Sequence, residues 1–122
     1  MKVLAIRGAT TVSSNTKEDI LNETTILIKS MIKANNLIID DIISMCFTMT
    51  NDLDAVYASV AVREGLNICD IPLLNFEEKY IKDSLKKCVR VMVYINTKKT
   101  RKDMKHIYLN EAKKLRVDIT GI

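Results

Sequence analysis

The amino-acid sequence predicts an α/β (α+β) fold, with about five strands in a mixed sheet and two helices. Three observations lead to this fold class. Several short apolar runs are bounded by turn residues, which is typical of buried strands. Residues 17–34 carry apolar side chains at helical spacing. Residues 88–95 alternate with the period of a strand. A chain of 122 residues suits one domain, and we expect that domain to span residues 1–122.

The N-terminal part of the chain predicts a strand and then the strongest helix. Residues 3–6 form a short apolar run that Arg7-Gly8 ends as a turn. Asn15 or Thr16 can cap the helix that follows. The pattern fades at Asn35-Asn36, and the residues that carry it are Ile20, Thr24, Leu27, Ile28, Met31 and Ile32.

The middle of the chain predicts a strand, a helix and another strand. Residues 42–49 are an apolar strand candidate, and residues 55–64 a short helix that Gly65 closes. Residues 68–74 are a third strand, in which Pro72 indicates an edge or a bulge. Residues 76–85 are expected to form a charged loop.

The C-terminal part begins with the clearest long strand. Alternation in residues 88–95 places Arg90 on one face, together with Cys88, Met92 and Tyr94, and valines on the other. After a basic loop or helical turn at residues 98–105 we expect a short strand at residues 106–109 and an extended piece at residues 112–116. Because two helices cannot cover both faces of such a sheet, apolar surface is left for a partner, and we expect a homo-oligomer.

Composition excludes several classes of function. The chain contains no apolar run of roughly 18 residues that could cross a membrane, and its start lacks a secretory core, so we expect a cytoplasmic location. Three cysteines without a Cys-x-x-Cys pair and a single histidine indicate neither a metal site nor a Ser-His-Asp triad. The net charge of +4 favours acidic partners, but aromatic residues are only 5%, which is few for stacking nucleic-acid bases.

Arginines are the candidates for binding an acidic ligand. Arg90 lies in mid-strand among apolar residues, where a charge needs either an ion pair or a polar cavity. A buried salt bridge and an anion site therefore both fit. Arg7 and Tyr108 could converge on the same place, and Arg63 and Arg116 are weaker candidates that by themselves fit solvated surface charges. Guanidinium groups bind carboxylates in a bidentate manner.

Six segments of the chain resemble one known family. They are Ile6-Arg7-Gly8-Ala9-Thr10-Thr11-Val12, Asp52-Leu53-Asp54-Ala55-Val56, Ala61-Val62-Arg63-Glu64, Leu85-Lys86-Lys87-Cys88-Val89-Arg90-Val91-Met92, His106-Ile107-Tyr108-Leu109 and Leu115-Arg116. The sequence is similar in these segments to the aroH-class chorismate mutases, small proteins unrelated in fold to the all-helical mutases. The resemblance runs from about residue 1 to 118 without a gap.

The resemblance implies a trimeric pseudo-α/β-barrel with active sites between subunits. It also implies the Claisen rearrangement of chorismate to prephenate, on the way to phenylalanine and tyrosine. Chorismate is a dicarboxylate, for which arginines are natural ligands. The reaction is pericyclic, so the resemblance implies no cofactor and no metal. Partners other than chorismate and further subunits, such as nucleic acid or a membrane, are not expected.

Residue roles follow from the same resemblance. Arg90 would bind the ether oxygen and act as the main catalyst, Arg7 would hold a carboxylate, and Tyr108 would hydrogen-bond nearby. Glu78 would face the ring, although a slip of one residue would put Glu77 there. The remaining implied positions surround the substrate: Arg63, Leu115 and Arg116 at the rim, and Tyr57, Ser59, Leu73, Leu74 and Asn75 along the pocket.

Some positions depart from the family pattern and leave alternatives open. Asn75 stands where Cys is frequent, Val60 replaces a common Lys, Leu74 replaces a Thr, and Val117 stands where Pro is usual. One alternative is a non-catalytic metabolite-binding trimer, because a pocket does not guarantee turnover. Another is an imine/enamine deaminase on a similar scaffold. A third is RNA binding through the basic residues 98–105.

Overall fold

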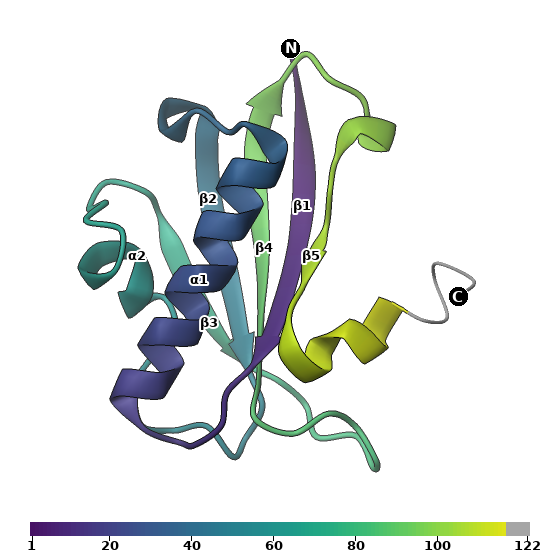
Figure 1. The fold of residues 1–122 in the computed structure, drawn as a ribbon. Coiled ribbons are helices and arrows are strands. Elements are labelled where there is room, and N and C mark those ends of the chain that lie inside the picture. The colour runs from purple at the N-terminus through teal and green to yellow at the C-terminus, as the bar shows by residue number, and fades with distance from the viewer. Residues whose placement is uncertain (117–122) are drawn as a thin grey trace.

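A computed structural model describes residues 1–116 of the chain. Its five strands form one sheet in the order β3-β2-β4-β1-β5, with helices α1 and α2 on one side (Figure 1). Along the chain the elements are β1 (Lys2–Thr11), α1 (Lys17–Asn35), η1 (Ile39–Asp41), β2 (Ile42–Met49), α2 (Val60–Glu64), β3 (Leu73–Glu77), β4 (Cys88–Thr97), η2 (Arg101–Asp103), β5 (Ile107–Tyr108) and η3 (Asn110–Arg116).

The sheet is mixed, as the sequence predicts. The central strand β4 runs antiparallel to both β1 and β2. The edge strands β3 and β5 run parallel to β2 and β1 respectively. The expected succession of strands and helices and the α+β fold class are therefore confirmed.

Capping residues define both ends of helix α1. Thr16 accepts a hydrogen bond from the backbone N–H of Asp19 at 3.1 Å, which satisfies one of the free donors at the helix start. Asn36 ends the helix in the left-handed conformation with φ 49°, and asparagine tolerates this better than most residues. Both predicted ends are confirmed.

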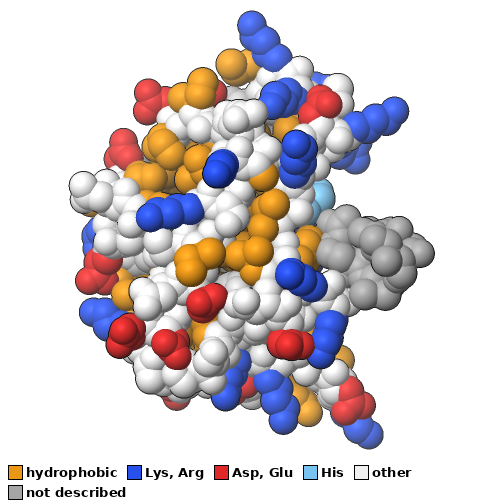
Figure 2. All heavy atoms as spheres, in the orientation of Figure 1, with side chains coloured by type: hydrophobic (Ala, Val, Ile, Leu, Met, Phe, Trp, Pro, Cys, Tyr) orange, Lys and Arg blue, Asp and Glu red, His pale blue; other side chains and the backbone are white. Residues whose placement is uncertain are grey.

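The core lies between the sheet and the two α-helices. Val89, Val91, Val93 and Ile95 of β4 are buried on this side, which confirms the predicted alternation. From α1 the buried residues that pack on them are Ile20, Leu27, Ile28 and Met31. Figure 2 shows this helical side, where positively and negatively charged side chains are interspersed over the surface. None of the helices within residues 1–116 is long and apolar enough to span a bilayer.

Neither α1 nor α2 covers the opposite face of the sheet, and η3 packs only over its end at Ala9 and Cys88. We call it the open face. Val3, Leu74 and Phe76 remain 57%, 60% and 50% exposed, and by strand pairing Leu74 and Phe76 lie on this face opposite Cys46 and Thr48. Exposed apolar side chains on a sheet face are typical of a surface that another protein covers.

Strand β1 is longer than the apolar run suggests. Arg7-Gly8 does not end it, because residues 7–11 continue to pair with β4 down to Cys88. Gly8 lies in mid-strand against α1, where a Cβ atom would come within 2.4 Å of Met31 Sδ. The glycine therefore allows a close approach of the helix and does not form a turn.

The predicted strand at residues 68–74 is wrong in position. The backbone N–H groups of Leu66 and Ile68 bond back to carbonyls of Ala61 and Val62, so the start of this segment forms the turn that ends α2. Strand β3 begins only after Pro72 and continues to Glu77. Pairing with β2, rather than hydrophobicity, decides its extent.

Two further boundaries also differ from the prediction. Helix α2 starts at Val60 and not at residue 55, because Asn15 Oδ1 accepts the N–H groups of Asp54 and Ala55 and holds that segment as a loop. Residues 112–116 are part of the 3₁₀-helix η3 and are not extended. The chain turns there at Asn110, whose φ is 53°.

Candidate active site

Strand pairing gathers three predicted site residues near one end of the open face. Arg90 lies opposite Thr48 of β2 and Ala9 of β1, and Ala9 lies opposite Tyr108 of β5. Paired residues point to the same side of a sheet, so Thr48, Arg90 and Tyr108 share one row. Arg7 precedes Ala9 by two residues and lies on the same face, one diagonal step from Arg90. Arg7 and Arg90, the two foremost of the candidate arginines, are thus neighbours.

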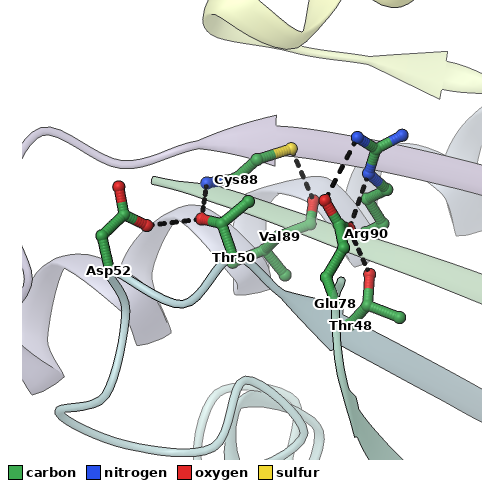
Figure 3. A network of polar contacts seen from close by, with 7 residues as sticks. All are labelled: Thr48, Thr50, Asp52, Glu78, Cys88, Val89 and Arg90. Atoms are coloured by element: carbon green, nitrogen blue, oxygen red, sulfur yellow. Dashed lines mark hydrogen bonds and ion pairs between the residues drawn. The ribbon is translucent and has the colours of Figure 1, made fainter. Parts of the chain in front are cut away.

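Glu78 joins this group from the residue just after β3. Its backbone N–H donates to the carbonyl of Met49 at 3.2 Å, which extends the pairing of β3 with β2. Its carboxylate reaches Arg90, with 3.3 Å between Arg90 Nη2 and Oε2 and 2.9 Å between Arg90 Nε and Oε1. The side chains of Arg90 and Glu78 are 29% and 18% exposed, so the pair is only partly screened by water. Thr48 Oγ1 also donates to Oε1, at 2.8 Å (Figure 3).

The Nε–H group of Arg90 is poorly satisfied. Although Nε lies 2.9 Å from Oε1 of Glu78, the N–H is not aligned with that oxygen and makes no hydrogen bond to any described residue. A buried donor without an acceptor costs free energy, and such groups in native proteins call for an explanation. A ligand oxygen on the open face would supply the missing acceptor.

A second polar network holds the start of β4. The Asp52 carboxylate accepts the backbone N–H of Lys87 at 3.0 and 3.1 Å and also the hydroxyl of Thr50. Thr50 Oγ1 in turn accepts the N–H of Cys88 at 3.0 Å. Figure 3 shows the contacts of Thr50 with Asp52 and Cys88 beside the Glu78–Arg90 pair. Because Arg90 follows Cys88 by two residues, the network sets the place from which the guanidinium extends.

Cys88 is a buried thiol next to this site. Burial raises the pKa of its thiol to about 11, and the nearby Arg90 opposes that rise without cancelling it. Ala9 and Ala112 cover the residue, with Tyr108 and Leu115 packed against them. A thiol with this pKa is protonated at neutral pH and is a poor nucleophile.

Arg7 is held by its backbone. Its N–H donates to His106 Nδ1 at 2.9 Å, which ties β1 to the segment before β5. This bond adds to the pairing of β5 with β1, which covers two residues. The single histidine therefore has a defined role next to the site.

A second group of predicted residues lies elsewhere. Asn75 lies opposite Phe47 on the helical side of the sheet, and its Nδ2 donates to Ser59 Oγ at 2.8 Å. The exposed Tyr57 and the amide of Asn75 line an open groove of about 730 Å³ beside β3, which also includes Phe76. This volume suits a small-molecule ligand.

The remaining predicted residues are spread over the surface. Arg63 is exposed on α2, and the half-buried Leu73 faces the core. Leu74 is on the open face, while Leu115 lies near Tyr108. The side chain of Arg116 is outside what the structure describes. A single chain therefore brings together Arg7, Glu78, Arg90 and Tyr108, but not the group around Asn75 or Arg63.

Sequence reasoning missed Thr48, Thr50 and the role of Asp52. A signal was present, because Ser44, Cys46 and Thr48 interrupt an apolar strand at every second position. This period marks a strand with one polar face. The pattern does not show which of these side chains donates a hydrogen bond to the Glu78 carboxylate.

Comparison with known proteins decides the family. Residues 3–119 match the model of chorismate mutase type I. The chain belongs to the type I chorismate mutase family. Members of this family are isomerases, and the chain is an enzyme of that class. The resemblance found in the sequence is thereby confirmed.

Individual relatives agree with this assignment. The chain is 36% identical to chorismate mutase AroH of Bacillus subtilis (strain 168) over 120 residues, which cover 98% of this chain and 94% of the relative. It is 34% identical to chorismate mutase AroH of Thermus thermophilus over 118 residues, 96% of each chain. A solved chorismate mutase from Clostridium thermocellum superposes with a TM-score of 0.87 at 49% identity, covering 90% of this chain and 97% of that one. The family match favours chorismate mutase activity over the alternative of an imine/enamine deaminase.

Proposed function

We propose that this chain converts chorismate to prephenate in phenylalanine and tyrosine biosynthesis, with Arg90 as the principal catalytic residue. The observation that carries the proposal is the buried Nε–H of Arg90, which has no described acceptor and lies beside Arg7, Glu78 and Tyr108. Two arginines next to each other suit a dicarboxylate substrate. The single carboxylate among them suits a ligand that also develops positive charge.

Arg90 acts on charge that appears during the reaction. As the ether C–O bond breaks, negative charge develops on its oxygen, and a fixed N–H donor at that oxygen stabilises the transition state more than the substrate. The rearrangement needs neither a base nor a nucleophile from the protein. A protonated Cys88 thiol is therefore compatible with it.

The other residues of the row bind and orient the substrate. Arg7 holds one carboxylate, with Tyr108 as a hydrogen-bonding neighbour, and together they keep the side arm of chorismate over the ring. Glu78 faces the ring, where positive character develops. A millionfold acceleration requires about 8 kcal/mol, and one donor supplies about 3–4 kcal/mol, so these contacts act together.

We further propose a homotrimer with each site between two subunits. Tyr57, Ser59 and Asn75 lie by the groove beside β3, and Arg63 lies on α2, away from Arg90. These residues and the Arg90 group can surround one substrate when they come from different copies of the chain. The exposed apolar residues of the open face supply contact area for this assembly.

The cytoplasm is the proposed location. Cys46, Cys69 and Cys88, which are all within the described residues, are unpaired. Free thiols are typical of a reducing compartment.

Two measurements test these proposals. Purified protein is mixed with chorismate and the loss of chorismate absorbance is followed; a rate equal to the uncatalysed one contradicts the activity. For the assembly, Arg90→Ala and Arg63→Ala are produced separately and then co-expressed in one cell. If the two residues serve one site from different subunits, the mixed oligomers contain some intact sites and regain activity that neither variant has. A monomer by light scattering, or co-expression without any recovery, contradicts the shared site.

A further inference from the structure

We propose that Thr48 is a positioning residue that keeps the Nε–H of Arg90 available for the substrate by holding the Glu78 carboxylate out of alignment with it. The inference rests on the proposed function of the site and goes beyond it. Thr48 does not act on the reacting atoms itself. Its hydroxyl acts through Glu78 on Arg90, and all three side chains meet at one place (Figure 3).

The contact between Arg90 and Glu78 is not the usual one for these side chains. An arginine beside a carboxylate commonly makes two parallel hydrogen bonds. Here Nη2 donates to Oε2 at 3.3 Å, which is long for a charge-assisted bond, and Nε lies 2.9 Å from Oε1 without making a hydrogen bond. The carboxylate is close enough to take both donors but is turned so that it takes only one.

Thr48 supplies a reason for this orientation. Its Oγ1 donates to the same Oε1 atom at 2.8 Å, the shorter of the two hydrogen bonds that the carboxylate receives from side chains of the row. Thr48 lies directly opposite Arg90 across β2 and β4, so both approach the carboxylate from one row of the sheet. The backbone of Glu78 is fixed by its bond to Met49. The carboxylate can still rotate, so that Oε1 aligns either with the hydroxyl of Thr48 or with the Nε–H of Arg90.

Removing the hydroxyl changes that competition. Without Thr48 as a donor, Oε1 can align with the Nε–H, and Arg90 and Glu78 form the bidentate pair. The buried donor is then satisfied within the protein and no longer available to an oxygen of the substrate. The consequence falls on the step in which charge develops at the ether oxygen, more than on binding.

Matched variants separate this role from packing. Thr48→Val keeps the branched shape and loses the donor, while Thr48→Ser keeps the donor and loses a methyl group. We expect Thr48→Val to lower kcat about tenfold with KM changed less than about threefold, the pattern of an interaction specific to the transition state. Thr48→Ser should restore kcat to within about threefold of the original protein. Equal kcat in Thr48→Val and the original protein overturns the inference, as does a Thr48→Ser variant as slow as Thr48→Val.

A spectroscopic measurement tests the same point without turnover. The Nε–H resonance of Arg90 is assigned in ¹⁵N-labelled protein by its loss in Arg90→Lys. In Thr48→Val its proton signal should move downfield, as expected for an N–H that gains a carboxylate acceptor, and in Thr48→Ser it should stay in place. An unchanged resonance in Thr48→Val overturns the inference. If the original protein does not turn over chorismate, the proposed function fails while this resonance still decides the role of Thr48.

Discussion

Replacing Arg90 by lysine tests the central role assigned to the site. The positive charge stays, but one ammonium group replaces a fork that reaches Glu78 through Nη2 and still presents its Nε–H. The lysine can serve either the Glu78 carboxylate or the substrate oxygen. The variant therefore loses about one preorganised donor at the ether oxygen, and removal of such a donor costs about 3–4 kcal/mol, or 100- to 1000-fold in kcat. KM should rise less, because the proposed contact of Arg7 with a carboxylate is unchanged.

The assay is the loss of chorismate absorbance under saturating substrate, with kcat and KM determined separately. Arg101→Lys is the matched control, since it makes the same replacement at an exposed position in η2. Lys102→Ala controls for the loss of one positive charge from the surface. Both should retain kcat within about twofold, as expected for surface substitutions. An Arg90→Lys protein that is folded, has the oligomeric state of the original and keeps kcat within threefold of it would refute the assigned role.

Three further predictions concern the framework of the site. The pKa of the Cys88 thiol is about 11 in the folded chain, against an ordinary value of 9.0. Between these pH values the folded chain keeps a proton that the unfolded chain loses. The contribution of the thiol to folding stability is therefore complete below pH 9 and is lost as the pH rises towards 11. Urea unfolding at several pH values should thus show a steeper alkaline decline for the original protein than for Cys88→Ser, and parallel curves would be contrary to this. Gly65→Ala should destabilise the fold by about 1–3 kcal/mol in thermal or urea unfolding, since its Cβ would lie 2.7 Å from the carbonyl oxygen of Ala61; unchanged stability would show that the contact relaxes. Asp52→Ala leaves the N–H of Lys87 without its acceptor, so we expect a loss of about 1–3 kcal/mol in the same assay and a lower kcat through displacement of the start of β4; a variant as stable and as active as the original would exclude this role.

Local patterns were enough to predict most of the elements. The cap at Thr16, the end of α1 at Asn36 and the alternating faces of β4 depend on residues close together in sequence, and the structure confirms each. Strand β2 has the predicted bounds for the same reason, Ile42–Met49. In these segments, capping groups and hydrophobic periodicity agree with the packing.

The errors lie where distant contacts overrule local preference. The apolar residues 68–72 read as a strand, but Ile68 bonds back to the end of α2, and β3 instead includes the exposed Phe76 and Glu77 because it pairs with β2. The loop before α2 is likewise held open by Asn15, about 40 residues away in sequence. No local pattern contains such information.

The amino-acid sequence was enough to predict the fold class, the family and the need of the Arg90 charge for a partner or a ligand. It left open whether that partner was a salt bridge or a substrate. Only the tertiary structure showed that both descriptions apply, because Glu78 pairs with Arg90 yet the Nε–H has no acceptor among residues 1–116. The orientation that decides this depends on Thr48 and Glu78, which lie 30 residues apart and meet only where β3 pairs with β2. The alignment of a hydrogen bond depends on the positions of its atoms in three dimensions, which periodicity and spacing along the chain do not predict.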